Sequence, residues 1–150
     1  MVLGIRVYDA MSTNPKRISP NATVEEAVKR MVKENIGSLI VCEDDEIKGI
    51  LTERDILQKL VAKHKDPKKV KVRDIMTKRV VTVSPNEDLE KAAKIMAKKG
   101  IRRLPVVDRK RVVGMLTVKD VLRLEPLLIE ILVEKLKISS RGYFKKFFGE

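Results

Sequence analysis

The sequence predicts an α+β fold in which two similar β-α-β-β-α units form a pseudo-two-fold pair. The first observation is an internal repeat: residues 7–57 align with residues 72–122 without a gap, and 19 of the 51 aligned positions are identical. The second is a helical spacing of apolar residues after the same Ser-Pro-Asn turn in both copies. The third is a pair of short apolar runs around a four-residue polar loop, which is typical of a β-hairpin.

Each copy begins with a short extended segment, at residues 16–19 or 80–84, that leads into the Ser-Pro-Asn turn. A helix follows, whose start is marked in the first copy by Thr23 and Glu26 in the arrangement of a capping box. Its apolar positions recur at helical spacing and are Val24, Ala27, Val28 and Met31 in one copy and Leu89, Ala92, Ala93 and Met96 in the other.

The hairpins are predicted from the apolar runs 38–42 with 47–51, and 103–107 with 112–116. A second helix is then expected over residues 53–62 in the first copy and 118–124 in the second. The predicted units therefore cover residues 7–62 and 72–124, joined by a polar, proline-containing linker at 63–71.

The segment after Pro126 has no counterpart in the first copy, and we treat residues 126–150 as a C-terminal helix with a basic and aromatic tail. The apolar run 127–136 either covers an open face of the core or forms a dimer contact, and we expect a homodimer. The tail 141–150 is frayed, packs on a partner subunit, or touches nucleic acid or membrane; the second interpretation is preferred.

Charge and composition limit the possible partners. The net charge is +12, and it is uneven: residues 1–65 carry 11 basic and 10 acidic side chains, whereas residues 66–150 carry 22 and 11. An anionic partner is therefore expected to favour the second half. No stretch is long and apolar enough for a membrane helix, and no signal peptide is visible, which favours a cytoplasmic protein without membrane contacts.

Catalysis is not expected from this chain. It has no phosphate-binding G-x-x-x-x-G-K-[ST] loop, no G-x-S-x-G elbow and no H-E-x-x-H motif. The single histidine, His64, and the single cysteine, Cys42, leave no ordinary nucleophile–base pair and no Cys-rich metal site. We predict a protein that is not an enzyme and has no catalytic residues, metal or cofactor.

The candidate site residues lie where each hairpin meets the second helix. Gly49 to Asp55 returns 65 positions later as Gly114 to Asp120, with a Thr and an Asp in both copies. A glycine in a strand lets another backbone or a ligand approach closely. Thr52 with Asp55, and Thr117 with Asp120, are either simple helix caps or groups whose carboxylate binds the vicinal hydroxyls of a ribose.

Basic residues distinguish the second copy from the first. Arg102-Arg103 replaces Gly37-Ser38, and Lys78-Arg79 replaces Thr13-Asn14. Because the planar guanidinium group offers two parallel donors, arginine is well suited to phosphate. These four basic residues are candidate phosphate ligands, although a solvated surface charge is the alternative for each taken singly.

The repeated set D-x-M-[ST], S-P-N before a helix, L-x-V-V-[DE] and G-h-L-T-x-x-D (h, apolar) resembles the CBS domain, and two in tandem resemble a CBS pair, or Bateman module. The resemblance implies that the two units pack their sheets together and leave two clefts for AMP, ADP, ATP or S-adenosylmethionine. It implies that Asp55 and Asp120 hold the ribose, with Thr52 and Thr117 beside them.

The same resemblance implies an apolar lining for adenine, formed by Ile18, Ile36, Val81 and Ile101. Lys16, Arg54 and Lys119 are further candidates for phosphate contacts. The resulting prediction is a regulatory or sensor module that binds an adenine nucleotide and acts through a separate protein partner. The alternatives are nucleic-acid binding through the basic second half and a module specific for S-adenosylmethionine.

Overall fold

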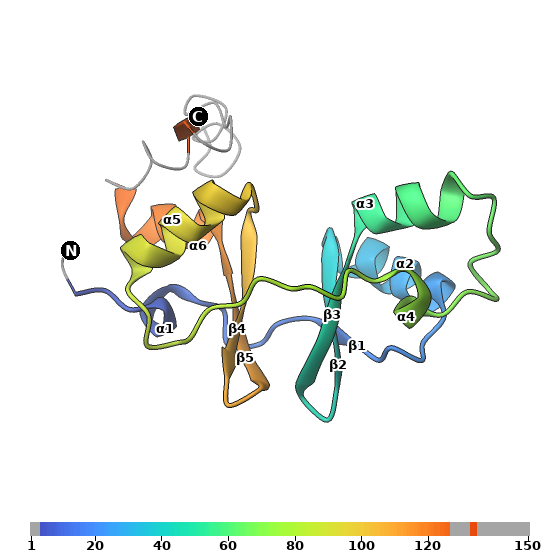
Figure 1. Cartoon of the computed structure of the whole chain (residues 1–150), viewed down its shortest axis with the longest axis horizontal. Helices are drawn as coiled ribbons and strands as arrows, with labels where there is room; N and C mark the ends of the chain where they lie inside the picture. Colours follow the sequence, from blue (N-terminus) through green and yellow to red (C-terminus); the bar gives the residue numbers. More distant parts are fainter. Residues whose placement is uncertain (1–3, 127–132, 135–150) are drawn as a thin grey trace. The chain divides into compact units, whose positions relative to one another are not determined.

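The computed structural model describes residues 4–126 and 133–134 (Figure 1). These residues form both helices and strands, which confirms the predicted α+β class. The elements are α1 (Val7–Ala10), β1 (Arg17–Ile18), α2 (Val24–Glu34), β2 (Ser38–Glu43), β3 (Glu46–Thr52), α3 (Glu53–Ile56), the π-helix η1 (Leu57–Val61), α4 (Val72–Ile75), α5 (Leu89–Lys99), β4 (Arg103–Asp108), β5 (Arg111–Thr117) and α6 (Val118–Leu124). Apart from Pro126 and residues 133–134, the predicted C-terminal helix and tail lie outside the described residues.

The chain forms two compact units, and each takes its short first helix from the other repeat. The Asp55 unit comprises residues 15–81 and 109–112 and so includes α4. The Asp120 unit comprises the described residues of 1–14, 82–108 and 113–150 and so includes α1. Each unit is therefore completed by a segment that the sequence repeat assigns to the other copy.

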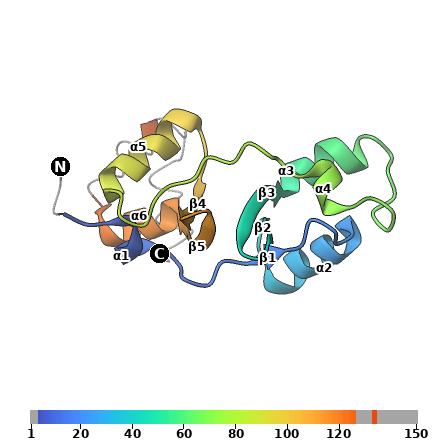
Figure 2. The same ribbon diagram turned by 60° about the horizontal axis from the view of Figure 1, so that its bottom comes forward.

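In the Asp55 unit a short three-stranded arrangement carries helices on one face (Figures 1 and 2). Strand β1 pairs with β2 in parallel, and β2 pairs with β3 in antiparallel orientation with Ser38 opposite Thr52. Helix α2 starts at the predicted capping box, in which the Thr23 hydroxyl accepts a hydrogen bond from Glu26 N at 3.2 Å. The core beneath it consists of Val24, Ala27, Met31, Leu39, Val41, Leu51, Leu60, Val72 and Ile75.

The second helix of this unit departs from the sequence prediction. It is α-helical only over Glu53–Ile56 and continues as the π-helix η1, in which Ala62 N donates to Leu57 O at 2.9 Å. The equivalent helix of the Asp120 unit, α6, is α-helical over its full length Val118–Leu124, as predicted. A helical spacing of apolar residues does not distinguish an α-turn from a π-turn, which is why the sequence did not show this difference.

The Asp120 unit repeats the plan with β4, β5, α5 and α6. Val83 forms a parallel bridge with Val106 and β4 is hydrogen-bonded to β5. Helix α5 buries Leu89, Ala92, Ala93, Met96 and Ala97, four of which were predicted from the helical spacing. In both views α1, α5 and α6 lie on the same side of this hairpin (Figures 1 and 2).

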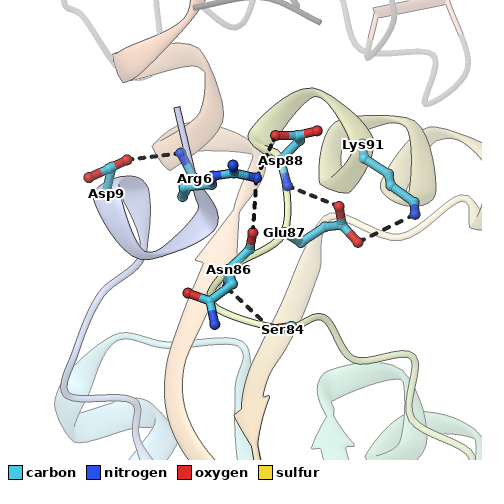
Figure 3. Close-up of polar contacts among 7 residues, drawn as sticks. All are labelled: Arg6, Asp9, Ser84, Asn86, Glu87, Asp88 and Lys91. Carbon is cyan, nitrogen blue, oxygen red and sulfur yellow. Dashed lines mark hydrogen bonds and ion pairs between the residues drawn. The ribbon is translucent and has the colours of Figure 1, made fainter. Parts of the chain in front are cut away.

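Arg6 attaches the N-terminal segment to the start of α5 (Figure 3). Its backbone N–H donates to the Asp9 carboxylate at 2.8 Å, and its guanidinium Nη1 donates to Asn86 O at 3.2 Å and to Asp88 Oδ1 at 2.9 Å. Leu89 N also donates to Ile5 O at 2.9 Å, so the N-terminal segment supplies an acceptor to the first turn of α5. Because of these contacts α1 belongs to the Asp120 unit, although in the sequence it lies in the first repeat.

Candidate functional site

The space beside each strand glycine is occupied by the chain's own backbone. Thr77 N donates to Ile50 O at 2.8 Å and Ile50 N donates to Thr77 O at 3.0 Å, so residues 76–77 run alongside β3. A Cβ placed on Gly49 would lie 2.8 Å from both Met76 Sδ and Thr77 O. A strand glycine allows either another backbone or a ligand to approach closely, and at Gly49 the structure shows another backbone.

Gly114 has the same surroundings in the other unit. Ser12 N donates to Met115 O at 2.9 Å, and a Cβ on Gly114 would lie 2.6 Å from Met11 Sδ and 2.7 Å from Ser12 O. The D-x-M-[ST] motif of one repeat thus fits the G-h-L-T motif of the other. Thr77 and Ser12, the last residues of the two D-x-M-[ST] motifs, therefore lie beside the strands that precede Asp55 and Asp120, respectively.

Thr52 and Asp55 cap the start of α3. The Thr52 hydroxyl accepts from Asp55 N at 3.2 Å, while Asp55 Oδ2 accepts from Thr52 N at 3.0 Å and from Thr52 Oγ1 at 3.0 Å. The cap interpretation of this pair is therefore correct as far as Oδ2 is concerned. The second carboxylate oxygen, Asp55 Oδ1, takes no part in this cap.

The second oxygen of Asp55 is bound by two side chains that the sequence interpretation did not include. Asp55 Oδ1 accepts from Lys59 Nζ at 2.9 Å and from Thr77 Oγ1 at 2.9 Å, and Lys59 Nζ also donates to Ile75 O at 3.0 Å. Lys59 stands four residues after Asp55 on the helix, and Thr77 is the last residue of D-x-M-[ST]. The i,i+4 spacing of opposite charges was the available signal for Lys59.

The Asp55 carboxylate is buried, with 5% of the residue exposed. Burial acts to raise its pKa, but the hydrogen bonds from Lys59, from the Thr52 backbone N–H and from the Thr77 and Thr52 hydroxyls outweigh it and hold the pKa below its usual value. Asp55 is therefore ionised at neutral pH.

Asp120 forms the same cap as Asp55, but its second carboxylate oxygen, Oδ1, has different neighbours. Asp120 Oδ2 accepts from Thr117 N at 3.0 Å and from Thr117 Oγ1 at 2.9 Å, and Asp120 N donates to the Thr117 hydroxyl at 3.2 Å. Asp120 Oδ1 faces Arg123 Nη1 at 3.8 Å, a distance typical of a loose ion pair and not of a hydrogen bond. As far as the described part of the chain is concerned, Oδ1 accepts no hydrogen bond.

The residues before β2 and β4 reach the helix starts through their backbones. Glu53 N donates to Gly37 O at 3.1 Å, and Val118 N donates to Arg102 O at 3.0 Å. The segments that carry Ile36 and Ile101 therefore lie beside Asp55 and Asp120, respectively. Ile18 and Ile36 are half-buried against the core of the Asp55 unit.

The predicted phosphate ligands are divided between the two units. Lys16, Arg54, Lys78, Arg79 and also Val81 of the apolar set belong to the Asp55 unit, and Arg102, Arg103 and Lys119 belong to the Asp120 unit. Lys16 Nζ is paired with Glu34 Oε1 at 3.2 Å, and Arg30 together with Lys16 holds the pKa of Glu34 below its usual value. Arg54, Lys78, Arg79 and Arg102 are exposed.

The described residues contain neither a candidate metal site nor a candidate membrane span. Within residues 4–126 and 133–134, no three His, Cys, Asp or Glu side chains are grouped in a way that would hold a metal ion. None of the described helices is both long enough and apolar enough to span a bilayer.

Comparison with known proteins identifies the family. The model of the CBS domain matches the chain twice, at residues 7–62 and 72–126. The chain is a tandem CBS-domain protein. The resemblance seen in the repeated motifs is thereby confirmed, and so is the predicted CBS-pair fold.

The relatives of this CBS pair include proteins of different lengths. Uncharacterized protein MK0525 of Methanopyrus kandleri is 41% identical over 121 residues, which are 79% of this chain and 62% of that protein. CBS domain-containing protein YhcV of Bacillus subtilis is 39% identical over 114 residues, which are 76% of this chain and 81% of that protein.

One similar solved structure contains bound ligands. The CBS domain pair of protein MJ0100, in complex with 5′-methylthioadenosine and S-adenosyl-L-methionine, aligns with a TM-score of 0.70 and 34% sequence identity. The alignment covers 80% of this chain and 98% of that one.

Proposed function

We propose that this CBS pair is a non-catalytic regulatory module that binds an adenine nucleotide such as AMP, ADP or ATP. The observation that carries the proposal is the Asp120 carboxylate, which is fixed at the start of α6 by Thr117 through Oδ2 and whose Oδ1 accepts no hydrogen bond from the residues that the structure describes. Hydrogen bonds from a ribose diol to such a charged acceptor contribute about 1.5–3 kcal/mol each. The ligands bound by the MJ0100 pair, both of which contain adenosine, support this choice.

The charge of the chain favours a phosphorylated ligand. Arg102 is exposed, and its carbonyl oxygen accepts a hydrogen bond from Val118 N in the first turn of α6. The Arg102 side chain therefore starts close to Asp120. Ribose at Asp120 and phosphate at Arg102 are the two contacts that we propose for a nucleotide in this unit. In this proposal the module has no chemistry of its own and its output passes through a separate protein partner.

The proposal is tested by thermal unfolding with AMP, ADP, ATP and S-adenosylmethionine at millimolar concentration. A ligand that binds the native state raises the melting temperature. Asp120→Asn keeps the shape of the side chain but removes the charge, and we expect it to weaken binding about tenfold or more. Asp108→Asn, an exposed carboxylate in the same unit, is the matched control and should bind as the wild type does.

S-adenosylmethionine is the second candidate ligand, because it occupies the similar CBS pair of MJ0100. It lacks phosphates and carries a sulfonium charge, so a chain of net charge +12 is expected to prefer the anionic nucleotides. A larger melting shift with S-adenosylmethionine than with AMP or ATP would reverse this order. If none of these compounds shifts the melting curve, the proposed function is wrong.

A further inference from the structure

The two equivalent carboxylates of this chain differ in how many hydrogen bonds they already accept. An ionised carboxylate has about four acceptor positions, two on each oxygen. Asp55 Oδ2 accepts from the N–H and the hydroxyl of Thr52, and Asp55 Oδ1 accepts from Lys59 Nζ and Thr77 Oγ1. All four positions of Asp55 are therefore filled by the protein itself.

Donors from the described residues fill only two of the four acceptor positions of Asp120. Its Oδ2 accepts from the N–H and the hydroxyl of Thr117, but within the described residues no hydrogen bond reaches Oδ1. The nearest cation, Arg123 Nη1, is 3.8 Å away and its side chain is 56% exposed. The exposed fraction of the carboxylate side chain is also larger, 13% for Asp120 against 7% for Asp55.

Two substitutions between the repeats account for the difference. The position of Lys59 is occupied by Leu124 in the second copy, which has no donor. The position of Thr77 is occupied by Ser12, which pairs with Met115 through its backbone but makes no hydrogen bond to Asp120 in the described structure. The π-turn η1 contains Lys59, whereas the corresponding part of α6 is α-helical.

We propose that Lys59 and Thr77 act as an internal substitute for a ribose diol, so that this chain binds one adenosine ligand, through Asp120. The inference rests on the proposed function and specifies which of the two repeats carries it. A ribose at Asp55 would have to displace an ammonium group and a hydroxyl that are already bonded, exchanging hydrogen bonds without a net gain. A ribose at Asp120 adds two charge-assisted bonds to an oxygen that accepts no hydrogen bond from the described residues.

Lys59 is thus a specificity-determining residue. It makes the two repeats unequal although their Thr and Asp residues are identical. Its ammonium group bridges Asp55 Oδ1 and Ile75 O, which links α4 to the helix that follows β3. The first repeat consequently uses its carboxylate to hold its own unit together, while the second keeps its carboxylate for the ligand.

The test is isothermal titration of the full-length protein with AMP, ATP and S-adenosylmethionine, with the number of sites per chain as the readout. We expect one site in the wild type and at least a tenfold loss of affinity in Asp120→Asn. Lys59→Leu combined with Thr77→Val copies the donor-free surroundings of Asp120 and should create a second site. That second site should persist when Asp120→Asn is added. Lys63→Leu, an exposed lysine close by, is the control for loss of charge and should keep one site.

The possible results of these titrations test the inference and the proposed function separately. Two sites in the wild type, or an Asp120→Asn protein that keeps one site of wild-type affinity, would overturn this inference while leaving the proposed function intact. A folded Lys59→Leu/Thr77→Val protein with a single site would show that these side chains do not block Asp55. If that variant does not fold, the wild-type site number and Asp120→Asn decide the question. Absence of binding by all three probes would overturn the proposed function together with the inference.

Discussion

Asp55 is a buried carboxylate whose ionised form is stabilised by four donors from the same unit. Because its pKa is lower in the folded than in the unfolded chain, the unfolded state binds more protons in the range between the two values. The contribution of Asp55 to stability is therefore complete above the unfolded value and is lost as the pH falls through the folded value.

The lowered pKa of Asp55 in the folded state leads to a prediction for Asp55→Asn. At pH 7 the variant should be less stable than the wild type by about 1–3 kcal/mol, because the amide cannot satisfy all of the donors around it. The difference should begin to shrink as the pH is lowered below about 4, because the carboxylate of the unfolded chain takes up a proton there, and it should continue to shrink until the folded carboxylate is itself protonated at a lower pH. Urea unfolding between pH 7 and pH 3 measures both values.

The control for this experiment is Glu43→Gln, which alters an exposed carboxylate at the end of β2. It should remain within about 0.5 kcal/mol of the wild type at pH 7. A difference between wild type and Asp55→Asn that grows toward acidic pH would contradict the assignment of Lys59 and Thr77 as stabilising partners of the ionised form.

At the level of elements, the contact between each M-[ST] segment and the strand glycine joins parts that come from different repeats. Met76 and Thr77 lie against Gly49, and Met11 and Ser12 lie against Gly114. The approach is close, since a Cβ would lie only 2.8 Å from the carbonyl oxygen of Thr77 at Gly49 and 2.7 Å from that of Ser12 at Gly114. A glycine is required here for space, since neither residue has a positive φ.

We predict that Gly49→Ala and Gly114→Ala each destabilise the protein by about 1–3 kcal/mol through overpacking. The Met side chain can shift, but the carbonyl oxygens of Thr77 and Ser12 are held in place, because they accept hydrogen bonds from Ile50 N and Met115 N, respectively. Chemical denaturation would measure the loss. Lys48→Ala, at the exposed position beside Gly49, should change stability by no more than about 0.5 kcal/mol. Glycine variants as stable as this control would argue against the contact.

For the whole molecule, the uneven charge is the property that bears on ligand choice. The chain carries +12, and residues 66–150 supply most of the excess. Charges on exposed side chains act over about 10 Å at 0.1 M salt and over much shorter distances at 1 M. The contribution of Arg102 and its basic neighbours to phosphate binding should therefore depend on ionic strength.

This dependence gives a prediction that separates phosphate from ribose recognition. Raising the salt from about 0.05 M to about 0.5 M should weaken binding of ATP more than binding of adenosine, because only ATP gains from the screened charges. Titration of both compounds at the two salt concentrations measures the difference. An equal effect on the two affinities would mean that the basic residues do not contact the phosphates.

Much of the fold was accessible from the sequence because the repeat supplied most of the local signals twice. The helical spacing predicted α2 and α5, the capping box of Thr23 and Glu26 is present, and the Thr-Asp pairs stand at the helix starts as expected. The short helices α1 and α4 were not predicted, since each spans only four residues. The contact between the residues that follow each of these helices and the glycine of the other repeat is a long-range interaction that no local pattern records.

The sequence by itself determined that two similar α+β units exist, that each presents a Thr and an Asp at a helix start, and that the second is the more basic. Only the tertiary structure decided how the two carboxylates differ. That difference depends on Lys59 and Thr77, which reach Asp55 from a π-turn and from a segment 22 residues further along the chain. Hydrogen-bond saturation is a property of atoms brought together in space, and identical motifs can therefore have different capacities to bind a ligand.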